Sequence, residues 1–207
     1  RYAAVCDYKT GSPKLFLNEI MEGLSLQLIT YLLALSKTKD TKDLLPAAMM
    51  YIYLHGRPKS MSVPPNGIPH AKEKENTNGI FLNDPDVLRT LDSQSGTDDG
   101  FIGVSYVKDG SVKKTSPVLT AEEFEALKAL TEKILIRLYS RLESGEIAIH
   151  PVKNGTLSPC SYCPYRSICR FDPALPENSF DYISKVSDKT IREKLDEEMK
   201  RNGKENL

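Results

Sequence analysis

The sequence has 207 residues and equal numbers of basic and acidic side chains, 28 of each, so its formal net charge is zero. Hydrophobic residues make up 40% and charged residues 27%, as in a globular protein, and no apolar run approaches the roughly 20 residues of a membrane span. The length supports one main domain with insertions, and the neutral balance argues against a strongly basic nucleic-acid coat while leaving room for a local basic groove.

The first elements predicted along the chain are a strand, a helix and a second strand. Residues Tyr2 to Tyr8 alternate loosely between apolar and polar side chains and end at Thr10-Gly11, which predicts a strand that runs into a turn. Apolar residues at helical spacing from Glu19 to Lys37, after Asn18 as N-cap, predict one helix. The apolar run from Ala47 to Leu54 predicts a buried strand.

The middle of the chain begins with a change of composition. Residues 57 to 77 are rich in Pro, Lys, Glu, Asn and Ser, which predicts a loop or a mobile insert. The segment from 79 to 92 predicts a short strand, a turn and a helix that begins near Asp84 with Pro85 in its first turn. Asp109-Gly110 between two strand-like runs, 101 to 107 and 111 to 116, predicts a β-hairpin.

The strongest helix signal begins at Thr120, where Thr120 and Glu123 form a capping box, and it extends to about Ser144. Its expected buried face consists of Phe124, Leu127, Leu130, Ile134, Leu138 and Leu142. An edge segment at 147 to 152, a cysteine-rich loop and a charged helix from Asp188 to about Lys200 complete the chain. These elements predict an α/β fold, and the expected divisions are 1–57, 58–100, 101–150, 151–178 and 179–207.

Two charged side chains lie close together on the first strand. Asp7 and Lys9 are two positions apart, so both project from one face of that strand, while Cys6 and Tyr8 project from the other. A carboxylate can hold a divalent cation that polarises a phosphate, and a neighbouring lysine can serve the attacking water or stabilise developing charge. The alternative is an exposed ion pair at the end of a strand.

The predicted helix that follows carries two polar side chains among apolar residues. Gln27 and Tyr31 are four positions apart and therefore share one helix face. A buried glutamine needs hydrogen-bond partners. Alternatively, Gln27 lies at the edge of the apolar stripe and Tyr31 belongs to the core.

A strand with (D/E)-x-K followed by a helix with Q-x3-Y resembles the PD-(D/E)xK nucleases of the RecB type. The resemblance implies a mixed sheet flanked by helices and a site that binds Mg2+ or Mn2+. It assigns Asp7 as the second metal-binding acid, Lys9 as the lysine of the motif, and Gln27 and Tyr31 as the helix motif. The strand from Ala47 to Leu54 would follow this helix in the family's order.

The sequence departs from the family pattern at its beginning. In these nucleases an earlier acid on the preceding strand also binds the metal, and here it would lie before Arg1. We therefore expect only a partial PD-(D/E)xK core, belonging to a fragment of a longer protein. Because an incomplete set of carboxylates binds a divalent cation poorly, we expect the fragment alone to be nearly inactive.

Three of the four cysteines, Cys160, Cys163 and Cys169, form a C-x2-C-x5-C cluster. A disulfide framework would spread its cysteines, whereas this cluster concentrates thiolates as metal sites do, so we expect a cytoplasmic protein with a metal or iron-sulfur centre. Zinc would need a fourth ligand, for which His150 and Cys6 are candidates. The alternatives are an ordinary surface histidine and a small buried cysteine.

The resemblance favours iron and sulfur for this cluster. The B subunits of AddAB-type helicase-nucleases and certain CRISPR-adaptation nucleases carry the same three-cysteine pattern together with one cysteine far upstream, and the four hold a [4Fe-4S] cluster that ties the domain ends together. Here Cys160, Cys163 and Cys169 match the downstream ligands, and the fourth would lie outside the fragment. The segment from 58 to 118 is unexplained by the compact CRISPR type and favours the AddAB type.

The resemblance implies a Mg2+-dependent, single-strand-directed DNA exonuclease. In the family it acts with a helicase partner, the A subunit, in an ATP-binding complex that processes double-strand breaks, so DNA and that subunit are the expected partners and no membrane is involved. Arg166 and Arg170 flank the cysteine loop and are candidates for phosphate contacts. The alternative is a non-catalytic DNA-binding or scaffolding module that keeps the fold and the metal centre.

Overall fold

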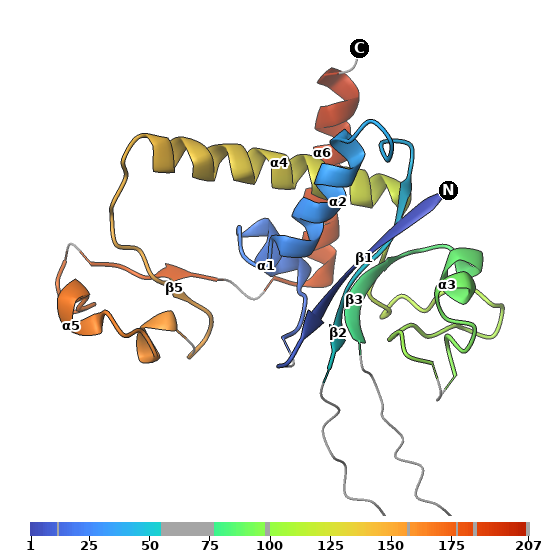
Figure 1. Ribbon diagram of the computed structural model, residues 1–207, viewed down its shortest axis with the longest axis horizontal. Helices are drawn as coiled ribbons and strands as arrows, with labels where there is room; N and C mark the ends of the chain where they lie inside the picture. The colour runs from blue at the N-terminus through green and yellow to red at the C-terminus, as the bar shows by residue number, and fades with distance from the viewer. Residues whose placement is uncertain are drawn as a thin grey trace, which may run out of the picture.

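A computed structural model describes residues 1–11, 13–54, 77–97, 100–156, 158–176, 178–183 and 186–205. Its centre is a four-stranded mixed sheet in the order β1-β2-β3-β4 (Figure 1). The strands are β1 (Tyr2–Lys9), β2 (Leu45–Tyr53), β3 (Thr77–Leu82) and β4 (Val118–Leu119). β1 is parallel to β2, β2 is antiparallel to β3, and β3 is parallel to β4. The predicted α/β class with a mixed sheet is confirmed, whereas the predicted insert at 57 to 77 lies, except for Thr77, outside the described residues.

The parallel pair β1 and β2 is joined by two helices, α1 (Leu17–Met21) and α2 (Gln27–Lys37). The prediction of one helix from Glu19 to Lys37 was wrong. Gly23 has φ +84° and ends α1, because the Gly23 and Leu24 amides donate back to the Ile20 and Glu19 carbonyls. Asn18 is inside α1, and the N-cap position belongs to Phe16.

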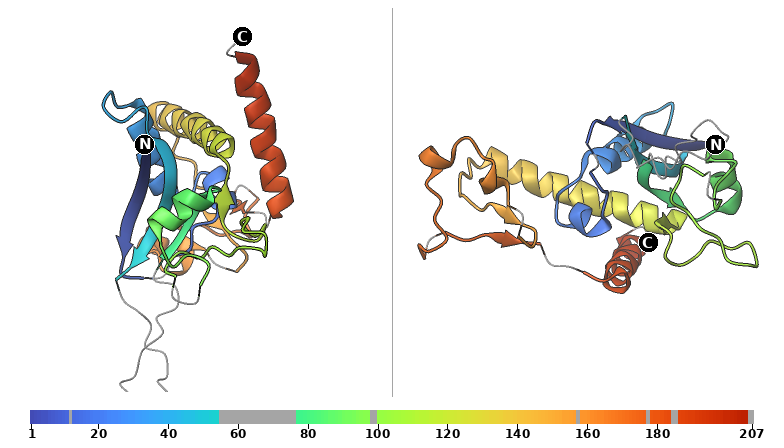
Figure 2. Two further views of the ribbon diagram at one scale, coloured as in Figure 1. Left: turned by 90° about the vertical axis from the view of Figure 1, so that its right-hand side faces the viewer. Right: turned by 90° about the horizontal axis from the view of Figure 1, so that it is seen from below.

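Helix α4 (Ala121–Glu143) packs across α2 and against α6 (Asp188–Glu205), on one face of the sheet (Figures 1 and 2). Both helices were predicted, and both groups of the predicted capping box are present. The largest buried cluster lies here and includes Val5, Ile20, Leu28, Ile29, Met49, Phe124, Leu127 and Leu195.

The predicted buried face of α4 is correct only in its first half. Phe124, Leu127 and Ile134 are buried and Leu130 is half-buried, but Leu138 is 39% exposed and Leu142 is 77% exposed. The second half of α4 extends beyond the sheet, toward the cysteine loop (Figure 1). The apolar residues in the second half of α4 therefore have the helical spacing of a buried face, but no described element covers them.

Helix α3 (Pro85–Leu91) packs against β3 and helps to bury a second apolar cluster that includes Met50, Phe81 and Leu88. The predicted order of strand, turn and helix is confirmed here. Asp84 caps α3 by accepting from the amides of Asp86 and Val87 at 2.9 and 3.2 Å.

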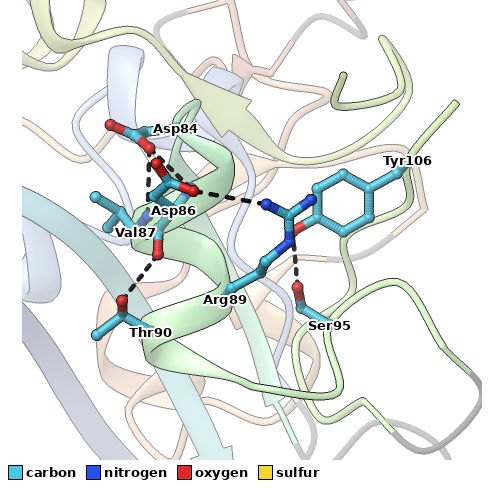
Figure 3. Close-up of polar contacts among 7 residues, drawn as sticks. All are labelled: Asp84, Asp86, Val87, Arg89, Thr90, Ser95 and Tyr106. Carbon is cyan, nitrogen blue, oxygen red and sulfur yellow. Dashed lines mark hydrogen bonds and ion pairs between the residues drawn. The ribbon is translucent and has the colours of Figure 1, made fainter. Parts of the chain in front are cut away.

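Figure 3 shows how α3 is attached to the loop that follows it. The Arg89 guanidinium lies 5.6 Å from the centre of the Tyr106 ring and 3.6 Å from an Asp86 oxygen, and the Tyr106 hydroxyl lies 2.7 Å from Ser95 Oγ. These contacts attach α3 to the loop that follows it, and the sequence pattern does not predict that attachment.

The predicted hairpin around Asp109-Gly110 is present only as a turn with one bridge, between Tyr106 and Val112. Its turn is closed by the Val107 amide, which donates to the Ser111 carbonyl at 2.9 Å. Further from the turn, backbone amides bond to side chains instead of to the opposite strand of a hairpin. Buried Asp92 accepts from the amides of residues 101 and 102, and the Ser105 amide donates to Ser116 Oγ. Extended strands were therefore the wrong prediction here.

The cysteine-rich loop lies at the far end of α4, away from the sheet (Figures 1 and 2). Its ends are joined by two short parallel strands, β5 (Val152–Lys153) and β6 (Asp181–Tyr182), and it contains the 3-10 helix η1 (Pro159–Ser161) and helix α5 (Arg166–Cys169). Beside these strands, the Lys153 ammonium lies 4.9 Å from the centre of the Phe180 ring, which packs edge-on to Phe171. Of the predicted edge segment at 147 to 152, only Val152 is in a strand. Among the described residues, no helix has the length and apolar character needed to cross a bilayer.

Candidate functional site

The predicted acid and lysine project from the face of β1 that is covered by helices. Asp7 and Lys9 share this face with buried Val5, and Asp7 is paired in register with Tyr51 of β2. Lys9 Nζ lies 2.6 Å from Asp7 Oδ2, and the two side chains are 31% and 22% exposed, respectively. The pair is therefore half-buried at the edge of the core rather than free on the surface.

Lys9 also contacts the helix that follows the strand. Its Nζ donates to Gln27 Oε1 at 3.0 Å, and Gln27 Nε2 donates to the Tyr31 hydroxyl at 3.3 Å. Gln27 is the first residue of α2, so the connection between α1 and α2 brings its amide to the site. The structure thus joins all four residues, Asp7, Lys9, Gln27 and Tyr31, in one series of contacts. The expectation of a buried glutamine was wrong, since Gln27 is exposed and Tyr31 is 48% exposed.

The electrostatic setting of Lys9 keeps it charged. Its contact with Asp7 raises the pKa of the Lys9 ammonium above its ordinary value, so it carries a proton throughout the neutral range. A protonated lysine is a poor general base and a good partner for negative charge. The arrangement therefore suits charge stabilisation on a phosphate better than proton abstraction by Lys9.

Asp7 has a carboxylate oxygen in a buried position. This Oδ2 atom lies 2.6 Å from Lys9 Nζ, which is its ion-pair partner. Such an oxygen fits a divalent cation, whose preferred ligands are carboxylates and water. One carboxylate is not a complete set, and no three His, Cys, Asp or Glu side chains in the described part of the chain gather where they could hold a metal ion.

Tyr51 belongs to this site and was not predicted from the sequence. Its ring is 5% exposed, and Lys9 Nζ lies 5.1 Å from the ring centre, within the range of a cation-π contact. Burial raises the pKa of the Tyr51 hydroxyl, so the ring stays neutral beneath the ammonium. Tyr51 lies in a continuous buried run of β2, where no pattern distinguishes one side chain from its neighbours.

The cysteine cluster is the second candidate site. Cys160, Cys163 and Cys169 are free thiols, the first two half-buried and the third exposed, and Cys169 is the last residue of α5. Three thiols within ten residues of sequence are the type of donor set that zinc or an iron-sulfur cluster uses. In the described residues, however, the three thiols do not gather into a group that could hold a metal ion. Arg166 and Arg170 are both exposed on the same loop.

The two other candidate zinc ligands have different surroundings. His150 is exposed, and its Nδ1 atom lies 3.4 Å from Ser179 Oγ. Cys6 is also exposed, which contradicts the expected small buried cysteine, because it projects from the face of β1 opposite to buried Val5. Partial desolvation nevertheless raises the pKa of the Cys6 thiol, which disfavours the thiolate that a metal requires.

Comparison with known proteins identifies the family of this chain. The family model of the PD-(D/E)XK nuclease superfamily matches residues 1–170. The chain is 32% identical over 201 residues to the B subunit of the ATP-dependent helicase/deoxyribonuclease of Desulforamulus reducens, 33% over 198 residues to that of Clostridium kluyveri, and 30% over 203 residues to that of Bacillus subtilis. These alignments cover 92%, 92% and 94% of this chain but 17% of each relative.

The matched region includes β1 with Asp7 and Lys9, α2 with Gln27 and Tyr31, and all three clustered cysteines. The region that the family model matches thus covers both candidate sites. The chain belongs to the PD-(D/E)XK nuclease superfamily, as a domain of the type found in the B subunits of these helicase/deoxyribonucleases.

Proposed function

We propose that this chain is the nuclease domain of a helicase-nuclease subunit and that it hydrolyses single-stranded DNA with Mg2+ or Mn2+ during double-strand-break repair. The observation that carries the proposal is the buried Oδ2 atom of Asp7, which lies 2.6 Å from the charged Lys9 ammonium. A cation and an ammonium side by side are what phosphodiester hydrolysis needs, since negative charge grows on the phosphate oxygens.

The four residues have distinct roles in this proposal. Asp7 would hold the divalent ion, which supplies a Lewis acid for the phosphate and a more acidic water. Lys9 faces the negative charge of the phosphate and remains protonated because Asp7 raises its pKa. Gln27 fixes the Lys9 ammonium from α2, and Tyr31 fixes the Gln27 amide. The remaining ion ligands, the first metal-binding acid among them, would come from outside this sequence, so the isolated chain should be nearly inactive.

The cysteine loop would hold a [4Fe-4S] cluster through Cys160, Cys163 and Cys169, with a fourth cysteine from outside this sequence. The composition of the loop, with three thiols within ten residues of sequence, supports a metal centre of structural type. Zinc is the alternative ion for the same donor set. Other proposed partners are DNA and a helicase A subunit, since the related proteins are named as subunits of an ATP-dependent helicase/deoxyribonuclease.

The decisive experiment replaces Asp7 in the full-length subunit, assembled with its partner and supplied with ATP, Mg2+ and duplex DNA. Asp7→Asn preserves the shape of the side chain and removes the charge that would bind the ion. We expect the cutting of one DNA strand to fall on the order of 100-fold or more, as when a group that stabilises transition-state charge is removed, while unwinding continues. Asp40→Asn, an exposed acid in the loop before β2, is the matched control and should cut normally.

The outcome also separates the enzyme from a scaffold. If Asp7→Asn still cuts both strands at the normal rate, Asp7 is not a catalytic residue and the assignment fails. If the unaltered complex unwinds DNA without cutting the strand assigned to this domain, the chain is a DNA-binding or scaffolding module that retains the nuclease fold.

A further inference from the structure

The connection between α1 and α2 contains a backbone conformation that its residue does not favour. Ser25 has φ +48°, in the left-handed region that side chains other than glycine rarely adopt. It lies two residues before Gln27, the side chain that holds the Lys9 ammonium. A residue held in this region needs surrounding contacts that fix it there.

Glu19 supplies these contacts with three of its oxygen atoms. Its main-chain carbonyl accepts from the Leu24 amide at 2.8 Å, and its Oε2 accepts from Ser25 Oγ at 2.8 Å. Its Oε1 accepts from Asn154 Nδ2 at 3.4 Å, so one carboxylate joins the turn at Ser25 to a residue far along the chain. Glu19 is half-buried, which favours persistence of these bonds.

Asn154 is the residue that follows β5, where the cysteine-rich loop begins. The same carboxylate therefore contacts the segment that sets the start of α2 and the base of the loop that carries Cys160, Cys163 and Cys169. Glu19 is also close to the Lys9 site. Its negative charge raises the pKa of Tyr51, although burial and the charges of Lys9 and Asp7 have larger effects on that pKa.

We propose that Glu19 is a positioning residue that couples the base of the cysteine loop to the Lys9 site, through the Ser25 turn and Gln27. The catalytic meaning of this coupling rests on the proposed nuclease function, but the coupling itself does not. Withdrawal of Asn154 removes one of the two side-chain bonds that orient the Glu19 carboxylate. The carboxylate then holds Ser25 less firmly, and the Gln27 amide moves relative to Lys9.

The test is an NMR measurement on the 207-residue chain labelled with carbon-13 at the ε position of lysine. Because Lys9 lies against the Tyr51 ring, its ε protons should be displaced by the ring current, and a Lys9→Arg variant identifies the signal. We expect Ser25→Ala to move this signal toward that of an exposed lysine, because the left-handed conformation remains unfavourable and its hydrogen bond is lost. Ser25→Gly should leave the signal near its original position, because glycine adopts positive φ without help.

Asn154→Ala tests the distant end of the coupling. It should move the Lys9 signal in the same direction as Ser25→Ala but by less, and in a Glu19→Ala background it should have no further effect. Glu22→Gln, an exposed acid at the end of α1, is the control and should not move the signal. Circular dichroism establishes that each variant is folded, and if Ser25→Ala does not fold, Asn154→Ala decides.

The proposal fails if folded Ser25→Ala and Asn154→Ala both leave the Lys9 signal unmoved, or if Ser25→Gly moves it as far as Ser25→Ala. Since no nuclease activity enters the measurement, its failure is distinct from failure of the proposed function. In the assembled enzyme, Asn154→Ala should lower kcat with little change in KM, since it would displace Lys9 without removing a DNA contact.

Discussion

The Lys9 ammonium has three neighbours of different chemistry: a carboxylate, an amide oxygen and an aromatic face. All three favour the charged form, and Asp7 is the largest cause of its raised pKa. The contribution of Lys9 to folded-state stability is therefore fully present below its unfolded-state pKa and is lost as the pH rises through its higher folded-state pKa. At neutral pH the site retains its positive charge whether or not substrate is present.

The aromatic neighbour can be tested alone. Tyr51→Leu removes the ring face, and because a cation-π contact stabilises only the ammonium, the pKa of Lys9 should fall toward its ordinary value. Tyr51→Phe keeps the face and should leave the Lys9 titration where it is in the unaltered chain. A carbon-13 NMR titration of lysine ε carbons measures both variants. Equal titration of Lys9 in the two variants would mean that the ring contributes nothing to the charge.

The elements differ in how far their residues alone determined them. The start of α4 and the start of α3 were predictable, because Thr120 and Asp84 cap their helices by bonds to amides two or three residues away. The break between α1 and α2 was missed, because the apolar spacing continues through Gly23 and Ser25. The exposure of Leu142 was unpredictable too, because helical spacing states which side chains share a face and not whether another element covers it.

The capping box makes α4 a sensitive point of the fold. Glu123 accepts from the Thr120 amide and from Arg192 of α6, so the first turn of α4 is attached to the C-terminal helix. We expect Thr120→Ala to lower the free energy of unfolding by about 1 kcal/mol and Tm by about 2–4 °C. Thr120→Ser keeps the hydroxyl and should stay near the original Tm. The Tm of each variant is measured by thermal unfolding followed by circular dichroism. Equal losses of Tm in the two variants would mean that loss of the cap hydroxyl is not the cause.

At the scale of the whole molecule, the chain consists of a packed sheet-and-helix core and a cysteine loop carried at the end of α4 (Figure 1). Local periodicity placed the D-x-K residues on one strand face and the Q-x3-Y residues on one helix face, and the family resemblance implied that the two pairs belong to one site. The contribution of Tyr51 and the Glu19 to Asn154 contact could not be predicted, because both depend on segments brought together only by the tertiary fold.

The metal proposal predicts a difference among the four cysteines. Purified without oxygen as part of the full-length subunit, Cys160→Ser and Cys169→Ser should each lose most of the bound iron and acid-labile sulfide. Cys6→Ser is the matched control and should keep the metal, since Cys6 lies on β1 in the sheet, away from the cysteine loop. Metal and sulfide analysis per chain is the measurement. Zinc without sulfide would mean that the loop binds zinc instead of an iron-sulfur cluster. Equal amounts of metal in the unaltered protein and in all three variants would mean that the cysteine loop does not bind the metal.

The parallel pairing of β1 with β2 also determines the order in which the molecule can fold. A parallel pair cannot be closed by a tight turn, so Tyr51 reaches Asp7 only after α1 and α2 have crossed over the sheet. Helices such as α4 form within about a microsecond from neighbouring residues, whereas contacts between distant segments must first overcome the entropy of closing a long loop. A refolding chain therefore regains most of its helix before Lys9 has its partners, and the site is among the last parts of the molecule to return.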